Sequence, residues 1–88
     1  MNKPHNIMLY SKPGCHLCED AKAALLSLGQ EFEVRLEEID ITGDPALFEL
    51  YQYTIPVMLI DQKIKLEARI TAHKLRLALS EGYGPKIS

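Results

Sequence analysis

Apolar residues recur along the chain with two different spacings, and these spacings predict its secondary structure. The continuous apolar run at residues 7–10 indicates a buried strand, and the Ser, Pro and Gly within residues 11–14 indicate a turn. From residue 17 to residue 28 the apolar positions follow helical spacing, and Gly29 is a suitable stop. The chain is therefore expected to open with a strand, a turn and a helix.

The next segment alternates, but its phase changes. Apolar residues alternate with charged ones from Phe32 to Leu36, as in a half-buried strand, whereas Ile39 and Ile41 continue in the opposite phase. We therefore expect this second strand to bulge or end near Glu37.

The remaining elements are indicated by capping residues and by a second alternating segment. They are a brief helix opened by Asp44-Pro45, a hairpin of residues 57–60 and 64–68, and a helix between Thr71 and Gly82. Asp44 is a favourable N-cap and Pro45 suits the first helical position. Thr71 can cap the last helix, and Gly82 can end it.

The order is strand, helix, strand, helix, hairpin, helix. A strand, helix, strand start implies a parallel pair joined by a right-handed crossover, and the hairpin can add two antiparallel strands. The pattern predicts an α/β fold in which a mixed four-stranded sheet is flanked by three helices. With 88 residues and no linker or repeat, we expect residues 1–88 to form a single domain.

Composition excludes several classes of function. The chain has 10 Lys plus Arg against 12 Asp plus Glu and no basic run, so no nucleic-acid partner is expected. The longest apolar runs, such as residues 57–60, are far shorter than the roughly 20 residues of a membrane span, so no membrane partner is expected. Two cysteines three positions apart do not form the disulfide framework of a small secreted domain. We expect a cytoplasmic protein.

The two cysteines carry the clearest chemistry. Cys15 and Cys18 lie at the predicted start of the first helix, where we expect free backbone N–H groups and the helix dipole to lower the pKa of the Cys15 thiol. Cys15 would attack a substrate disulfide, and Cys18 would resolve the mixed disulfide. His16 and Lys12 would add positive charge beside the thiolate.

Two other interpretations of the cysteine pair stay open. A structural disulfide across so short a loop gains little from chain entropy. A zinc site needs two more ligands, and the nearby candidates are only His16 and His5. No metal ligand is therefore assigned.

Two segments resemble the thioredoxin superfamily, and most closely its glutaredoxin-like members, in particular a short bacterial group. They are residues 9–18, LYSKPGCHLC, and residues 54–60, TIPVMLI. The resemblance covers essentially the whole chain and implies a thioredoxin-like fold of the glutaredoxin type, β-α-β-α-β-β-α. It implies that Cys15 is the nucleophile and Cys18 the resolving cysteine. It also implies a cis Ile55–Pro56 bond, with the Ile55 backbone offered to a substrate strand.

The resemblance also implies which residues contact substrate, but the sequence differs from the glutaredoxin pattern in two places. Dithiol glutaredoxins carry Cys-Pro-Tyr-Cys, whereas His16 and Leu17 stand between the cysteines here. Glutaredoxins also have a Gly-Gly pair before the last helix, and residues 67–71 contain no glycine. The residues expected to tune the cysteines or contact substrate are Lys12, His16, Thr54, Ile55 and Pro56. Arg69 and Thr71 would form a rim for glutathione, which would serve as a cosubstrate, with no cofactor bound.

The sequence thus predicts a thiol-disulfide oxidoreductase that reduces protein or glutathione-mixed disulfides through Cys15 and Cys18. Its partners would be a disulfide-containing protein or glutathione and an unknown thiol reductant, and the protein would be a monomer. Two alternatives from other classes remain. One is a non-catalytic thioredoxin-fold module that binds a partner strand at Ile55–Pro56, and the other is metal or iron-sulfur binding through the cysteines.

Overall fold

The computed structural model describes residues 4–87 and has the expected order of strands and α-helices. The elements are β1 (His5–Ser11), α1 (His16–Ser27), β2 (Val34–Asp40), the 3-10 turn η1 (Ile41–Gly43), α2 (Pro45–Tyr51), β3 (Val57–Ile60), β4 (Ile64–Glu67) and α3 (Ala72–Glu81). Only η1 has no counterpart in the sequence pattern. None of the helices within the described residues is long and apolar enough to cross a membrane.

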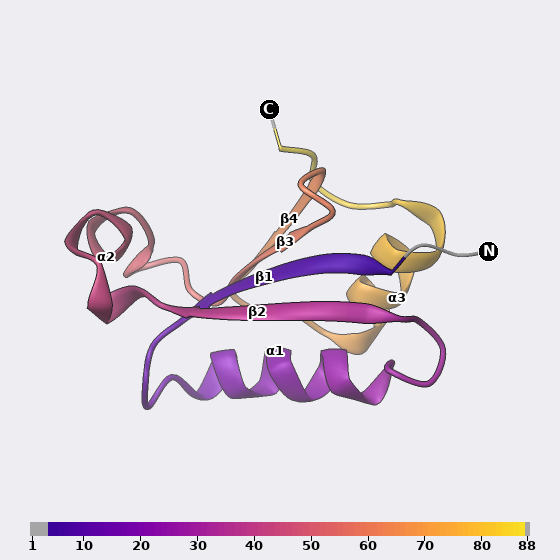
Figure 1. The fold of residues 1–88 in the computed structure, drawn as a ribbon, viewed down its shortest axis with the longest axis horizontal. Coiled ribbons are helices and arrows are strands. Elements are labelled where there is room, and N and C mark those ends of the chain that lie inside the picture. The colour runs from indigo at the N-terminus through magenta and orange to yellow at the C-terminus, as the bar shows by residue number, and fades with distance from the viewer. Residues whose placement is uncertain (1–3, 88) are drawn as a thin grey trace.

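The four strands form one mixed sheet in the order β2-β1-β3-β4 (Figure 1). β1 runs parallel to β2 and antiparallel to β3, and β3 runs antiparallel to β4. The β1–β3 register pairs Tyr10 with Val57, so the end of β1 lies beside the start of β3. The prediction of a mixed four-stranded sheet with three α-helices is confirmed.

Two apolar clusters hold the sheet between its helices. The larger cluster contains Ile7 and Leu9 of β1, Leu25 of α1 and Leu75 of α3, so α1 and α3 cover one face. Figure 1 shows both helices on the same side of the sheet and α2 at its far end, where β1 leads into α1. The smaller cluster joins the opposite face to α2, where the Tyr10 and Tyr51 rings lie 4.8 Å apart.

The expected bulge or end of the second strand near Glu37 is wrong. β2 continues to Asp40, and its register with β1 is regular from the pair His5 and Val34 to the pair Ser11 and Asp40. The change of phase has another cause, because Leu36 packs into the larger cluster and Ile39 into the smaller one on the other face. The strand therefore changes the face that it buries without breaking its pairing.

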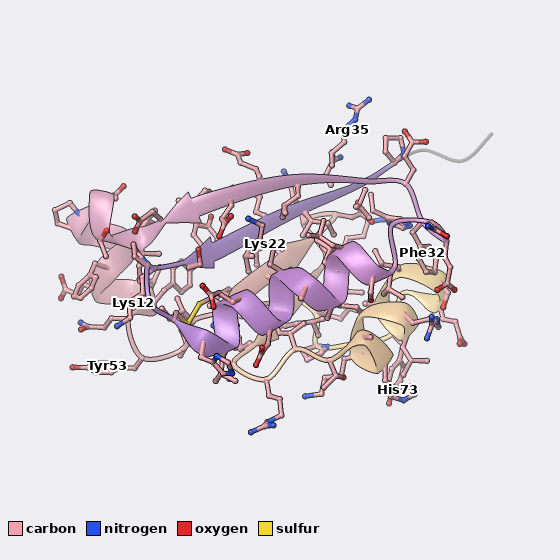
Figure 2. All side chains as sticks on the ribbon, turned by 90° about the horizontal axis from the view of Figure 1, so that it is seen from below. Lys12, Lys22, Phe32, Arg35, Tyr53 and His73 are labelled. Carbon is pink, nitrogen blue, oxygen red and sulfur yellow. A yellow bond between two sulfur atoms is a disulfide. The ribbon has the colours of Figure 1, made fainter. Side chains whose placement is uncertain are left out.

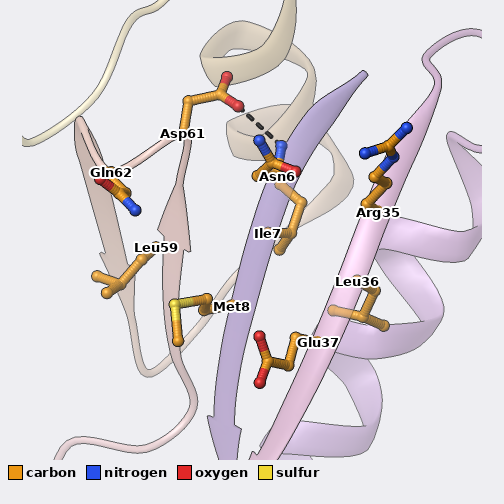
Figure 3. A pocket seen from close by; sticks show the side chains of 9 residues that line it. All are labelled: Asn6, Ile7, Met8, Arg35, Leu36, Glu37, Leu59, Asp61 and Gln62. Carbon is orange, nitrogen blue, oxygen red and sulfur yellow. Dashed lines mark hydrogen bonds between the residues drawn. The ribbon is translucent and has the colours of Figure 1, made fainter. Parts of the chain in front are cut away.

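α2 covers only part of its face of the sheet. Its seven residues reach the end of β1, and the rest of the face is open as a shallow hollow. Figure 3 shows the side chains of Met8, Glu37 and Leu59 on this open face, one from each of three neighbouring strands. The hydrogen bond from the Asn6 backbone N–H to Asp61, 2.8 Å long, closes one end of it.

The predicted helix caps are confirmed. The Asp44 carboxylate accepts the backbone N–H groups of Ala46 at 2.9 Å and Leu47 at 3.3 Å. The Thr71 hydroxyl accepts the N–H of Lys74 at 3.2 Å, and Gly82 ends α3 in the left-handed conformation with φ of 65°. These contacts satisfy backbone groups that the helix termini would otherwise leave unpaired.

Two regions near β4 differ from the sequence pattern. Ala68 was expected to continue the alternation of the strand, but it has a φ of 61° and donates its N–H to the Pro56 carbonyl at 2.9 Å. The sequence pattern also indicates no element after Gly82, but residues 85–87 lie along β4, with a bridge between Ile64 and Lys86.

Replacing Ala68 by glycine is predicted to stabilise the protein. Its left-handed backbone costs an L-residue roughly 1–2 kcal/mol, which exceeds the entropic cost of a glycine. We expect Ala68→Gly to raise the free energy of unfolding by about 0.5–1 kcal/mol in urea denaturation. The matched control is Ala23→Gly on the exposed side of α1, which should lower it by about 1 kcal/mol. Equal destabilisation by both substitutions would contradict the left-handed conformation.

Candidate active site

The two cysteines occupy the N-terminus of α1. Cys15 is the N-cap, with an extended backbone, and its Sγ accepts the backbone N–H of Cys18 at 3.2 Å. The two residues are joined by a disulfide, and their Cα atoms are 5.2 Å apart, which is within the usual range for such a bond. The capping position thus directs a helix-terminal N–H at the sulfur of Cys15.

The two sulfur-bearing side chains differ in burial. Cys18 is 3% exposed and belongs to the smaller apolar cluster with Tyr10 and Val57. Cys15 is only half-buried and packs at the edge of the same cluster. An incoming disulfide would therefore reach Cys15 first.

The segment before β3 lies beside the cysteines. The Ile55–Pro56 peptide bond is cis, as the resemblance implied, and Ile55 packs in the cluster that contains Cys18. The Ile55 N–H is donated to the Tyr51 carbonyl at 3.1 Å, and the Thr54 hydroxyl donates to the same carbonyl at 3.3 Å. The Ile55 N–H is thus engaged within the chain, and the expected contact of the Ile55 backbone with a substrate strand stays a prediction.

A polar group near Cys18 was not identified from the sequence. Ser11 is 5% exposed and donates its hydroxyl to Glu38 at 3.0 Å, and Lys22 donates to the other oxygen of Glu38 at 2.9 Å. Together with Cys18 and Lys12, these residues line a hollow of about 420 Å³. Glu38 was missed because the strand was expected to end near Glu37, although Ser11 at the end of the first apolar run was a usable signal.

The charge of Glu38 is stabilised by its two donors. The hydrogen bond from Lys22 lowers the pKa of Glu38 and that from Ser11 adds to it, which together outweigh the opposing effect of burial. Glu38 therefore stays ionised at neutral pH. The hollow beside Cys18 thus contains a paired carboxylate and ammonium group.

Lys12 and His16 lie at the same end of the molecule as the cysteines. Figure 2 shows Lys12 and Tyr53 at the same end of the molecule as the disulfide, whereas Arg35 and His73 lie toward the other end. The His16 side chain is 86% exposed, and its Nε2 is 3.6 Å from the Asp20 carboxylate on the next turn of α1. His16 therefore faces a carboxylate on the outer surface, and its role in tuning the thiol stays a prediction.

Arg69 and Thr71 are not brought into the hollow beside Cys18. The Thr71 hydroxyl caps α3, and Arg69 lines a separate groove along β4. Their expected role as a rim for glutathione stays a prediction. No group of three or more His, Cys, Asp or Glu side chains within residues 4–87 could hold a metal ion. A metal site at the cysteines would therefore need further ligands from outside this part of the chain.

The fold and the dithiol at a helix N-terminus define a thioredoxin-like α/β protein with a redox-capable cysteine pair. Residues 6–80 match the family described as Glutaredoxin-like domain (DUF836). The chain is 35% identical over 79 residues to a protein of Dictyostelium discoideum named glutaredoxin-like protein YDR286C homolog, and this match covers 83% of the chain and 73% of the relative. The chain therefore belongs to the glutaredoxin-like family.

Solved structures support the same assignment. The protein Ne2328 of Nitrosomonas europaea has a TM-score of 0.75 at 29% identity, over 91% of this chain and 96% of that one. The protein XcR50 of X. campestris has a TM-score of 0.69 at 29% identity, over 83% and 93% of the two chains. A structure described as a malarial protein, at 11% identity and a TM-score of 0.69 over 91% and 97% of the chains, shares the fold.

Glu38 is predicted to make stability depend on acid pH. Because the folded-state pKa of Glu38 is lowered, its contribution is complete above the unfolded value of about 4.3 and is lost as pH falls through the folded value. Urea denaturation at several pH values should show a smaller loss of stability between about pH 5 and pH 3 in Glu38→Gln than in the wild type.

Glu49→Gln is the matched control, because Glu49 is exposed on α2 and forms no ion pair within residues 4–87. This control should keep the wild-type pH dependence. At pH 7 Glu38→Gln should cost about 0.5–1 kcal/mol. A pH profile of Glu38→Gln identical to that of the wild type would contradict the stabilising contacts of Glu38.

Proposed function

We propose that the protein is a thiol-disulfide oxidoreductase that reduces protein or glutathione-mixed disulfides through Cys15 and Cys18. The observation that carries this proposal is the position of Cys15. Its sulfur is the N-cap acceptor of α1 and is the more exposed of the two cysteines. A helix N-terminus stabilises negative charge, so a thiolate is favoured at this position.

The reaction follows from this asymmetry. The Cys15 thiolate attacks one sulfur of the substrate disulfide, forms a mixed disulfide, and releases the other sulfur as a thiolate. Cys18 then loses its proton and attacks the Cys15 sulfur, which releases the second substrate thiolate and forms the Cys15–Cys18 disulfide. Two electrons pass to the substrate. A thiol reductant, with glutathione as the proposed cosubstrate, returns both cysteines to the reduced form in the cytoplasm.

Exposed apolar side chains near the dithiol favour polypeptide substrates. Leu17 stands between the cysteines and is exposed, and Tyr53 lies at the same end of the molecule (Figure 2). Large exposed apolar side chains are common at surfaces that contact another protein. A peptide that presents an apolar residue beside its disulfide would contact them.

A second candidate function is a non-catalytic module that holds a partner strand at the cis Ile55–Pro56 segment. It needs no reactive thiol, whereas the oxidoreductase does. The reactivity of Cys15 therefore separates the two functions.

Alkylation of the fully reduced protein as a function of pH, with mass mapping of each cysteine, is the direct test. Cys15 should react with an apparent pKa well below the free-thiol value of about 8.5, and Cys18 should lag behind it. Cys15→Ser should abolish turnover, whereas Cys18→Ser should accumulate a mixed disulfide with the substrate. If both cysteines titrate at or above about 8.5, the oxidoreductase is wrong and the binding module takes its place.

The polypeptide preference is tested with Leu17→Ser. We expect a higher KM for a disulfide-bonded peptide that carries an apolar neighbour, by about threefold to tenfold, and little change for a small polar disulfide. Leu26→Ser is the matched control, since Leu26 is exposed on α1 one helix length away from the dithiol. Equal effects of the two variants on the peptide would contradict a contact at Leu17.

A further inference from the structure

A second concave site lies beside β4, the strand at the edge of the sheet. It is a groove of about 360 Å³ between β4, α3 and the C-terminal tail. Its apolar wall consists of Leu66, Leu77, Tyr83 and Pro85. The hollow beside Cys18 shares none of these residues, so the groove is separate from the dithiol.

The wall formed by the tail is held in place by the backbone. The Lys65 N–H donates to the Pro85 carbonyl at 2.9 Å, and the Ile87 N–H donates to the Lys63 carbonyl at 2.9 Å. Gly84 lets the tail come this close, because a Cβ there would lie 3.0 Å from Cγ2 of Ile64. The tail is thus a fixed wall, and it carries the Tyr83 side chain, which is 70% exposed, at the rim of the groove.

Cations surround the apolar wall. Lys65, Arg69 and Lys74 line the groove, and Glu67 is the one carboxylate among its lining residues. The Lys65 ammonium lies 3.9 Å from Glu67, which compensates one charge. The Lys74 ammonium donates to the Arg69 carbonyl at 3.0 Å, and neither Lys74 nor Arg69 forms an ion pair within residues 4–87. Two positive charges therefore stand beside an apolar surface.

We propose that this groove binds a small organic anion with an apolar body, of the class of medium-chain aliphatic carboxylates. The apolar body would lie against Leu66, Leu77 and Tyr83, and the carboxylate would meet Arg69 and Lys74. The volume falls in the range of small-molecule sites, about 300–1,000 Å³. A stable protein partner would need about 800 Å² from this side, which a groove of this size does not offer.

The groove contacts the segment that supports the active site. Ala68, between the groove residues Glu67 and Arg69, donates its N–H to the Pro56 carbonyl at 2.9 Å. A bound anion could therefore alter the redox rate indirectly. For this reason binding is measured directly, and its failure leaves the proposed redox function unaffected.

The test is a titration of the uniformly ¹⁵N-labelled protein with octanoate, followed by amide chemical shifts. Saturable shifts are expected at Leu66, Arg69, Leu77 and Tyr83, and not on the open sheet face at Met8. 1-Octanol has the same chain without the charge and should bind at least about threefold more weakly. Acetate has the carboxylate without the apolar body and should leave these amides unchanged.

Variants separate the charge from the apolar wall. Arg69→Gln should weaken octanoate binding by about threefold to fivefold, whereas the matched control Arg35→Gln, on exposed β2, should not. Tyr83→Ala should also weaken it, because the rim is lost. The proposal is overturned if octanoate causes no saturable shift in this groove, if octanol binds as tightly as octanoate, or if Arg69→Gln and Arg35→Gln bind alike.

Discussion

The structure depends on the antiparallel pairing of β1 with β3 at the centre of the sheet. This pairing places the end of β1 beside the start of β3, with Tyr10 opposite Val57. The chain leaves β1 into the turn that carries Cys15, and it enters β3 through Ile55–Pro56. The two segments of the candidate site, 40 residues apart in the sequence, meet because one register brings them to the same end of the sheet.

β1 can hold this register because its last three residues, Leu9 to Ser11, are buried and face both sides of the sheet. Ile7 and Leu9 pack against α1 and α3, while Tyr10 packs against α2. A shift by one residue would exchange the two sets and place Tyr10 in the larger cluster. Burial of unlike side chains on the two faces therefore fixes the geometry of the dithiol as firmly as the cysteines' own helix does.

Local signals predicted the parts of the fold that local chemistry determines. The caps at Asp44 and Thr71 and the stop at Gly82 depend on side chains within one helical turn, so they could be recognised in the sequence. The Cys15–Cys18 spacing is local in the same way. The cis Ile55–Pro56 bond was available only through the family resemblance, because nothing in the neighbouring residues distinguishes it from a proline at the start of a strand.

What the sequence could not show depends on partners far along the chain. The phase change after Leu36 looked like a bulge because the helices that cover the two faces of the sheet cannot be assigned from β2 alone. The Ser11–Glu38–Lys22 group joins three elements and shares no motif. The path of the tail along β4 requires the missing side chain of Gly84 together with Ile64, a pairing that only the folded structure reveals.

The basic residue nearest to the cysteines in the sequence does not line the hollow beside Cys18. His16 lies between the cysteines, but its side chain faces Asp20 on the outer surface. Lys22, one helical turn after Cys18, lines the hollow beside Cys18. Lys22 is however already paired with Glu38. His16 and Lys22 thus each face a carboxylate, whereas the helix terminus directs the Cys18 N–H at the Cys15 sulfur.

The groove and the dithiol can influence each other through the backbone that joins them. They share no lining residue, and the backbone between them includes the Ala68 N–H bonded to the Pro56 carbonyl and the pairing of Val57 with Glu67. An anion held at Arg69 would change the chemistry at Cys15 only to the extent that it binds one arrangement of this segment more tightly than another. Ala68 holds a left-handed backbone at this point, so a change of conformation in the link between the two sites would relieve local strain.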